Sequence, residues 1–219
     1  MFVAPAARAP KLGVAVPADV TPLRRRPVQQ RSARRVERML DACADLIAEV
    51  GYDGVTTTLI AERAGVAVGS LYQFFPDKRA VVQALTLRNL DRFMNEVGQR
   101  FAERQLDDWW QVVDSVFDIY VSMHRDLPAF RKVHFGDVID PHLMDEQRDS
   151  NTVIAERLST LITERFGFPE SQVSTPMAVA IEAADSVLKL AFRRDPDGDA
   201  VLISEAKELI RDYLSKRIG

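Results

Sequence analysis

The residues best suited to bind a partner lie close together between Gly69 and Lys78, in the segment GSLYQFFPDK. Ser70 and Gln73 carry groups that hydrogen-bond to the edges of bases, and glutamine can form two such bonds with adenine. Tyr72 and Lys78 can bind phosphate oxygens, which fixes a protein's position on a duplex without reading its sequence. Gly69 has no side chain, so its backbone can approach a partner closely. The segment therefore predicts contacts with double-stranded DNA.

Two short helices must position these side chains. The first is predicted over TLIAERA, after Thr56 and Thr57, which can cap it, and the second covers residues 68–74. The apolar residues that would attach this pair to the preceding helix are Leu59, Ile60, Ala64, Val66, Leu71, Phe74 and Phe75. The outward-facing residues are then Thr58, Val68, Gly69, Ser70, Tyr72 and Gln73. Such a helix-turn-helix places the start of its second helix in the major groove, whereas the alternative is a plain packing unit that binds nothing.

A longer helix is predicted before this unit, over residues 31–50, because apolar residues recur there every three or four positions and Gly51 follows as a cap. The basic residues of its first turns are Arg31, Arg34, Arg35 and Arg38. The helix dipole disfavours cations at this end by roughly a few tenths of a kcal/mol each. Bound phosphates would reverse that penalty, so the cluster also predicts DNA contact; the alternative is a run that only improves solubility.

Charge divides the chain into a basic end and an acidic body. Residues 1–79 carry a net charge of +4 and residues 80–219 carry −7, which gives −3 for all 219 residues. We therefore expect a flexible, proline-rich basic arm over residues 1–27 that includes Arg26, and a helix-turn-helix DNA-binding domain over residues 28–76. A helical effector-binding and dimerisation domain would follow over residues 77–219. No segment alternates apolar and polar residues as a strand does, so the predicted fold is all-α.

Residues 32–85 resemble the TetR family of bacterial transcriptional regulators. The resemblance rests on Gly51, the paired threonines before IA, the motifs AGV and GSLYQFF, and Lys78, all in family order. It implies an all-α homodimer that binds an inverted-repeat operator, usually as a repressor that a small ligand releases from DNA.

The same resemblance implies roles for individual residues. Thr57, Tyr72 and Lys78 match positions that contact phosphate, and Thr58, Val68, Ser70 and Gln73 match positions that often face bases. The chain departs from the common pattern at Gln73, Phe74 and Arg79, so the operator sequence cannot be taken from relatives.

Two segments near the carboxyl end predict the dimer interface. Their small and apolar residues at helical spacing are Ala180, Ile181, Ala184, Val187, Leu188 and Ala191, followed by Leu202, Ala206, Leu209, Ile210 and Tyr213. Small residues let helices approach closely, and two such helices from each subunit would form a four-helix interface. The alternative is that these stripes face the core of their own subunit.

The middle of the chain is rich in aromatic residues that predict an effector pocket. The residues proposed to line it are Trp109, Phe117, Tyr120, Met123, His124, Phe130 and Asn151. Ligand pockets are mostly apolar with a few polar groups, so we expect a small apolar or aromatic effector oriented by Tyr120, His124 or Asn151. An aromatic stripe of this kind can equally be ordinary core.

Other classes of function are disfavoured. The chain has no recognisable catalytic nucleophile or acid pair, which predicts a protein that is not an enzyme, with no cofactor and no metal. The three histidines have no compact ligand spacing, and Cys43 is a single thiol on an apolar helix face. No apolar run is long enough to span a membrane. A single cysteine cannot form an intrachain disulfide, so we expect a protein of the reducing cytoplasm. The alternatives are a helical dimerisation or interaction module, or a metal- or redox-responsive regulator.

Overall fold

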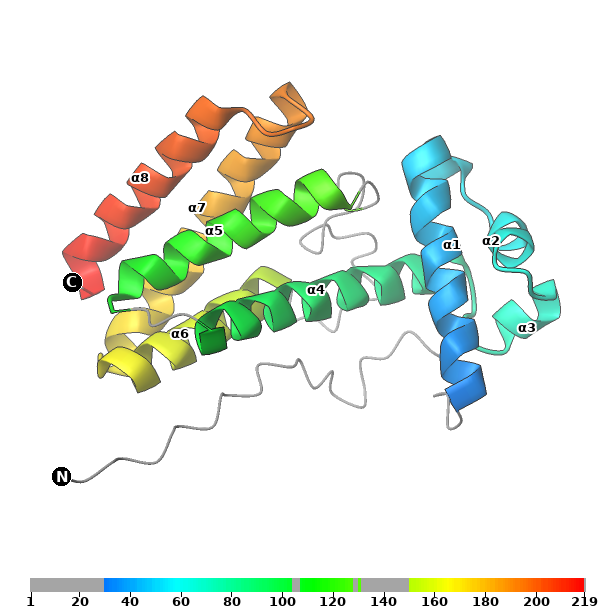
Figure 1. Cartoon of the computed structure of the whole chain (residues 1–219), viewed down its shortest axis with the longest axis horizontal. Helices are drawn as coiled ribbons and strands as arrows, with labels where there is room; N and C mark the ends of the chain where they lie inside the picture. Colours follow the sequence, from blue (N-terminus) through cyan, green and yellow to red (C-terminus); the bar gives the residue numbers. More distant parts are fainter. Residues whose placement is uncertain (1–29, 104–106, 128–129, 131–149, 219) are drawn as a thin grey trace.

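The fold is known from a computed structural model that describes residues 30–103, 107–127, 130 and 150–218 (Figure 1). All regular secondary structure in these ranges is α-helical, which confirms the predicted fold class. The helices are α1 (Gln30–Gly54), α2 (Thr57–Arg63), α3 (Val68–Tyr72), α4 (Lys78–Glu103), α5 (Trp109–Asp126), α6 (Ser150–Phe166), α7 (Glu170–Arg194) and α8 (Ala200–Ile218). The arm over residues 1–27, with Arg26, lies outside the described residues.

Helices α1, α2 and α3 form a small head at one end of the molecule (Figure 1). They share a core with the first two turns of α4, and this core includes Met39, Ile47, Ile60, Leu71 and Phe75. The caps follow the sequence: the Thr56 hydroxyl accepts a hydrogen bond from Leu59 N at 3.2 Å, and the Asp77 carboxylate accepts one from Ala80 N at 2.9 Å. Gly65 supplies the turn between α2 and α3, with φ of 64°. The turn at Gly65 therefore helps to set the angle between α2 and α3.

Two apolar residues of the head are not where the periodicity predicts. Val50 is 53% exposed and Leu59 is 39% exposed. Val50 lies directly before Gly51, whose φ of 72° breaks the helical path and ends the buried stripe. Leu59 lies on the seven-residue helix α2, which packs through its neighbours Ile60 and Ala61, so Leu59 points away from the core.

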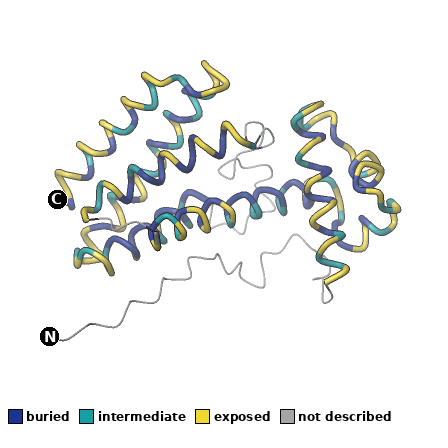
Figure 2. Tube along the Cα trace, in the orientation of Figure 1, coloured by how far each residue is buried: buried dark blue, intermediate teal, exposed yellow. Residues whose placement is uncertain are grey.

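The larger body is built from α5, α6, α7 and α8 around the second half of α4 (Figure 1). Helix α7 packs against both α6 and α8, and α4 and α5 complete the core. Figure 2 shows that α4 is buried along much of its length, since it joins the two cores. Helix α7 begins at Glu170, and Pro176 lies inside it.

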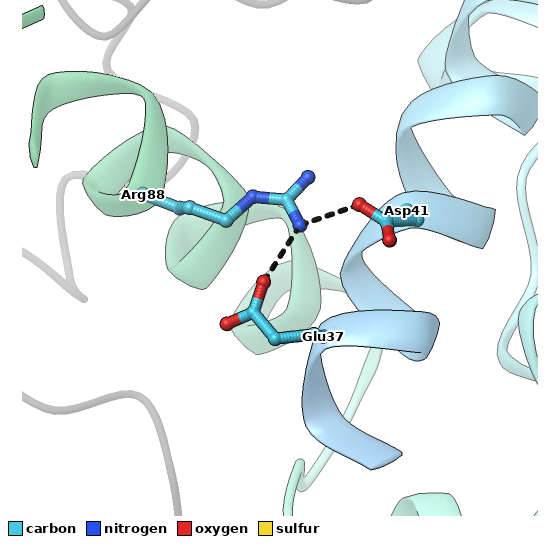
Figure 3. Close-up of polar contacts among 3 residues, drawn as sticks. All are labelled: Glu37, Asp41 and Arg88. Carbon is cyan, nitrogen blue, oxygen red and sulfur yellow. Dashed lines mark hydrogen bonds and ion pairs between the residues drawn. The ribbon is translucent and has the colours of Figure 1, made fainter. Parts of the chain in front are cut away.

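An ion-pair cluster ties the head to α4 (Figure 3). Arg88 Nη1 on α4 lies 2.7 Å from Asp41 Oδ1 and 3.1 Å from Glu37 Oε2, both on α1. The Arg88 side chain is only 13% exposed, whereas both carboxylates are more than half exposed. One guanidinium therefore holds two turns of α1 against the helix that leads into the body.

Replacing this arginine should loosen the head measurably. Arg88→Met keeps much of the apolar stem but removes both ion pairs, and we expect a loss of about 1–2 kcal/mol in the free energy of unfolding. The matched control is Arg63→Met, which breaks the exposed pair with Glu49 at 2.8 Å and should cost less, because solvent screens that pair. Urea unfolding of both variants measures the difference. A loss at Arg88 no larger than that at Arg63 would show that the cluster does not hold the head.

Candidate functional site

Helix α3 buries one face and exposes the other, as a recognition helix must. Leu71 and Phe75 are fully buried and Phe74 is 6% exposed, so the aromatic pair after the helix belongs to the head core. Tyr72 is 42% exposed, and Gly69 and Gln73 are also exposed. The side chains of Val68, Ser70 and Thr57 are half-buried, and Thr58 is exposed. The predicted contact residues therefore lie on the solvent side of the head.

Hydrogen bonds hold two of these side chains in place before any ligand binds. Thr57 Oγ1 on α2 and Tyr72 Oη on α3 lie 3.0 Å apart. Arg35 Nη1 on α1 donates to Ser70 Oγ at 3.1 Å, which leaves the hydroxyl proton of Ser70 available to donate. Sequence reasoning did not predict that Arg35 holds Ser70. This hydrogen bond joins residues 35 positions apart, so no local sequence pattern reveals it.

Lys78 is held against the end of α1. Its Nζ donates to the Tyr52 carbonyl oxygen at 3.1 Å and lies 4.3 Å from the centre of the Tyr52 ring. An ammonium group has three donors, so this contact leaves capacity for a phosphate oxygen. The side chain is half-buried, which restricts where that phosphate can lie.

The first turns of α1 add positive charge beside α3. Arg31 and Arg34 are exposed, and a shallow surface hollow is lined by Gln30, Arg31, Ala33, Arg34, Arg35, Glu37 and Arg38. The bond from Arg35 to Ser70 connects this basic turn to α3. We call the combined surface the α1–α3 face; it comprises Arg31, Arg34, Arg35, Thr57, Thr58, Val68, Gly69, Ser70, Tyr72, Gln73 and Lys78. Hydroxyl, amide and cationic groups occur together on it.

A cavity lies within the body, with about 510 Å³ of empty space including its open mouth. Its walls come from α4 to α8, and they are formed by Phe93, Val113, Val116, Phe117, Tyr120, Asn151, Ile154, Leu158, Met177, Ala180, Ile181, Ala184, Asp185, Leu188 and Ile210. Among the predicted effector residues, Phe117, Tyr120 and Asn151 line it. The apolar walls and the few polar side chains have the composition of a small-molecule site.

The other predicted effector residues are absent from this lining. His124 is fully buried and stacks on Phe192, with ring centres 4.0 Å apart, and Phe130 packs against the same imidazole at 4.6 Å. Met123 is also buried, and Trp109 packs on the core at the start of α5. These four residues, Trp109, Met123, His124 and Phe130, pack in the core around the cavity and do not line it, so their contact with an effector stays a prediction.

One end of the cavity is polar. Tyr120 Oη donates to Asp185 Oδ1 at 3.4 Å, and Asn151 Nδ2 donates to Asp185 Oδ2 at 3.4 Å and to Glu182 Oε2 at 3.2 Å. Lys189 Nζ lies 2.9 Å from Asp185 Oδ2. Sequence reasoning missed Asp185, although a carboxylate within the otherwise apolar stripe of α7 was a usable signal.

The predicted dimer stripe faces inward. Ala180, Ala184, Leu188, Ala191 and Ile210 are all buried in the core of their own chain, and four of them line the cavity. Ile181, Val187 and Tyr213 are half-buried against the same core. The periodicity identified an apolar face correctly, but α7 needs that face to pack on α6 and α8. These five residues are buried within the single chain, and the predicted dimer interface stays a prediction. The large apolar residues exposed on α7 and α8 are Val179, Val201 and Leu209, and Leu209 belongs to the predicted set.

Cys43 is fully buried in the head core, and burial raises the pKa of its thiol to about 12 against the opposing effects of Arg88 and Lys78. The thiol is therefore protonated at neutral pH, whereas the thiolate is the reactive form. At pH 8 we expect iodoacetamide to label Cys43 at least about 100-fold more slowly in the folded chain than in guanidinium chloride. Mass spectrometry follows the reaction. Equal rates in the two states would reinstate the redox-responsive alternative.

The metal-responsive alternative gains no support from the described ranges, where no group of three or more His, Cys, Asp or Glu residues could hold an ion. His134 and His142 lie outside those ranges. No helix in the described part of the chain is long and apolar enough to cross a bilayer.

Comparison with known proteins agrees with both halves of this arrangement. Residues 39–85 match a family described as "Bacterial regulatory proteins, tetR family", and residues 107–218 match "Tetracyclin repressor-like, C-terminal domain". A solved TetR-family transcriptional regulator from Streptomyces coelicolor is 39% identical, with 84% of this chain and 99% of that chain covered at a TM-score of 0.73.

Curated relatives are similar mainly over the head. The uncharacterised regulator YvdT of Bacillus subtilis is 26% identical over 45% of this chain and 51% of its own. The class A tetracycline repressor from transposon 1721 of Escherichia coli is 39% identical over 32% of this chain and 31% of its own. The matches thus span about half or less of these relatives' length.

Proposed function

Because this chain belongs to the TetR family of bacterial helix-turn-helix transcriptional regulators, we propose that it is a homodimeric repressor that a small effector releases from an inverted-repeat operator. The proposed role is DNA binding in the cytoplasm rather than catalysis. Repression is supported by the curated relatives that are named repressors, such as KstR of Rhodococcus jostii, 41% identical over 58 residues.

The exposed side of α3 is the observation that carries this proposal. Tyr72 and Gln73 are exposed, whereas their neighbours Leu71 and Phe74 are buried. The same short segment therefore provides both the head core and the proposed contact surface. Because the Tyr72 side chain is 42% exposed, it contributes little to the stability of the fold and is accessible to a partner. In the proposed complex Ser70 and Gln73 read bases, while Thr57, Tyr72, Lys78 and the α1 arginines bind phosphates.

Dimerisation would occur through the outer side of α7 and α8 rather than through the buried stripe. Val179, Val201 and Leu209 are large apolar residues exposed by 46%, 70% and 52%. Exposed apolar residues on two adjacent helices fit a two-fold interface of four helices. Two-fold symmetry would then place the recognition helices about 34 Å apart, one turn of DNA.

Helix α4 connects the two sites physically. Phe93 on α4 lines the cavity, and Arg88 on the same helix holds α1 through Glu37 and Asp41. A ligand that displaces Phe93 would tilt α4 and, with it, the head. Ligand and operator would then oppose each other, and the coupling must be equal in both directions.

Selection of bound genomic fragments tests the proposal. The purified chain is mixed with sheared genomic DNA, and the retained fragments are sequenced. We expect enrichment of an inverted repeat whose half-sites lie one or two helical turns apart. Retention of fragments with no shared sequence would contradict the proposed function.

A further inference from the structure

The cavity in the body has a strongly uneven distribution of polarity. Twelve of its fifteen lining residues are apolar, and they come from all five helices that surround it. The exceptions among these described residues are Tyr120, Asn151 and Asp185, and hydrogen bonds join the three side chains into one cluster. A bound molecule would therefore have an apolar body and a single polar end.

The polar cluster presents hydrogen-bond acceptors to the cavity rather than a cationic side chain. The Asp185 side chain is 12% exposed, and Glu182 Oε2 lies 3.2 Å from Asn151 Nδ2. Lys189 pairs with Asp185 but does not line the cavity. An anionic group at this end would meet two carboxylates, so a carboxylate or phosphate ligand is disfavoured.

The hydrogen bonds that Tyr120 and Asn151 donate to Asp185 are long, although Lys189 Nζ lies 2.9 Å from Asp185 Oδ2. Both contacts measure 3.4 Å, whereas an O–H···O bond is usually about 2.7–2.8 Å and an N–H···O bond about 2.9–3.0 Å. A hydroxyl group placed here can donate a short bond to the Asp185 carboxylate and accept one from Tyr120 or Asn151. A methyl group of the same size can do neither.

We propose that the effector is a small neutral molecule with an apolar body and one hydroxyl group, and that Asp185 recognises this hydroxyl with Tyr120 and Asn151. The proposal rests on the proposed function, since it names the chemical class that would release the operator. Asp185 thereby becomes a specificity-determining residue of the pocket.

A matched set of probes tests the proposal by isothermal titration calorimetry on the full chain. The probes are 4-ethylphenol, 4-ethyltoluene and 4-ethylbenzoate, which share one body and differ in the head group. We expect 4-ethylphenol to bind at least about tenfold more tightly than either of the others, because only its head group satisfies the carboxylate. Equal affinity for the phenol and the toluene, tightest binding of the benzoate, or no binding of the phenol would each overturn the proposal.

Two variants locate the recognition. Asp185→Asn should reduce the preference for phenol over toluene to less than about threefold, whereas Asp118→Asn, on an exposed site of α5, should keep it. Circular dichroism confirms that each variant remains helical, and the wild-type preference stands as a test if Asp185→Asn does not fold. An undiminished preference in folded Asp185→Asn would overturn the assignment.

Operator binding separates this proposal from the proposed function. If the chain binds its operator but the phenol shows no preference, the hydroxyl proposal fails while the regulator remains. If the chain binds no duplex, the proposed function fails whatever the calorimetry shows.

Discussion

Replacing Tyr72 with alanine is expected to weaken operator binding by roughly 100-fold or more. A hydrogen bond to a charged group contributes about 1.5–3 kcal/mol, and a dimer loses one in each head. Tyr72 is 42% exposed and its hydroxyl lies 3.0 Å from Thr57 Oγ1, so its loss should affect DNA binding more than folding. Fluorescence anisotropy with a labelled operator measures the dissociation constant.

Two phenylalanine variants sharpen this test. Tyr72→Phe keeps the ring and removes only the hydroxyl, so it should reproduce most of the loss. Tyr52→Phe removes a hydroxyl from the same head but keeps the ring against which Lys78 lies, and it should bind normally. If Tyr72→Ala binds the operator as tightly as the parent, the α1–α3 face is not the contact surface.

Replacing Phe75 with alanine should lower the free energy of unfolding by about 3–5 kcal/mol. Phe75 is fully buried in the head core and follows α3 directly. The substitution leaves a cavity beside α3, because the head core that Phe75 shares with Met39, Ile60 and Leu71 is built from several helices and cannot fully close. Thermal unfolding followed by circular dichroism measures the change.

Leu59→Ala is the control for this second test. Leu59 is an apolar residue of the same head but is 39% exposed, so its truncation should cost no more than about 1 kcal/mol. A loss at Phe75 equal to that at Leu59 would mean that α3 is not anchored by its buried aromatic residue.

The head could be predicted from sequence in most of its detail because its signals are local. Gly51, Thr56, Gly65 and Asp77 mark helix ends through their own backbone or side-chain chemistry, and each acts within a few residues. The shared burial of Leu71 and Phe75 follows from their helical spacing of four residues. The bond from Arg35 to Ser70 could not be predicted, since it depends on how α1 and α3 pack.

The body was predictable in its helices but not in its surfaces. Helical spacing shows that Ala184 and Leu188 share an apolar face, but it does not show what covers that face. In the structure this face packs into the core of the same chain. The same limit applies to His124. Its imidazole could bind a ligand, but in the structure the ring packs against Phe130 and Phe192. The role of Asp185 depends on its hydrogen bonds with Tyr120 and Asn151, which lie on two other helices, so sequence alone does not reveal it.

The dependence of operator binding on salt tests the central claim most directly. The full chain is titrated onto its selected operator and onto a shuffled duplex of equal length, between 50 and 300 mM salt. Basic groups of two heads displace counterions from phosphates, so the logarithm of the binding constant should fall with the logarithm of salt at a slope steeper than about −4, with the operator preferred throughout. Equal binding to both duplexes, or affinity that does not change with salt, would contradict a paired head that reads DNA.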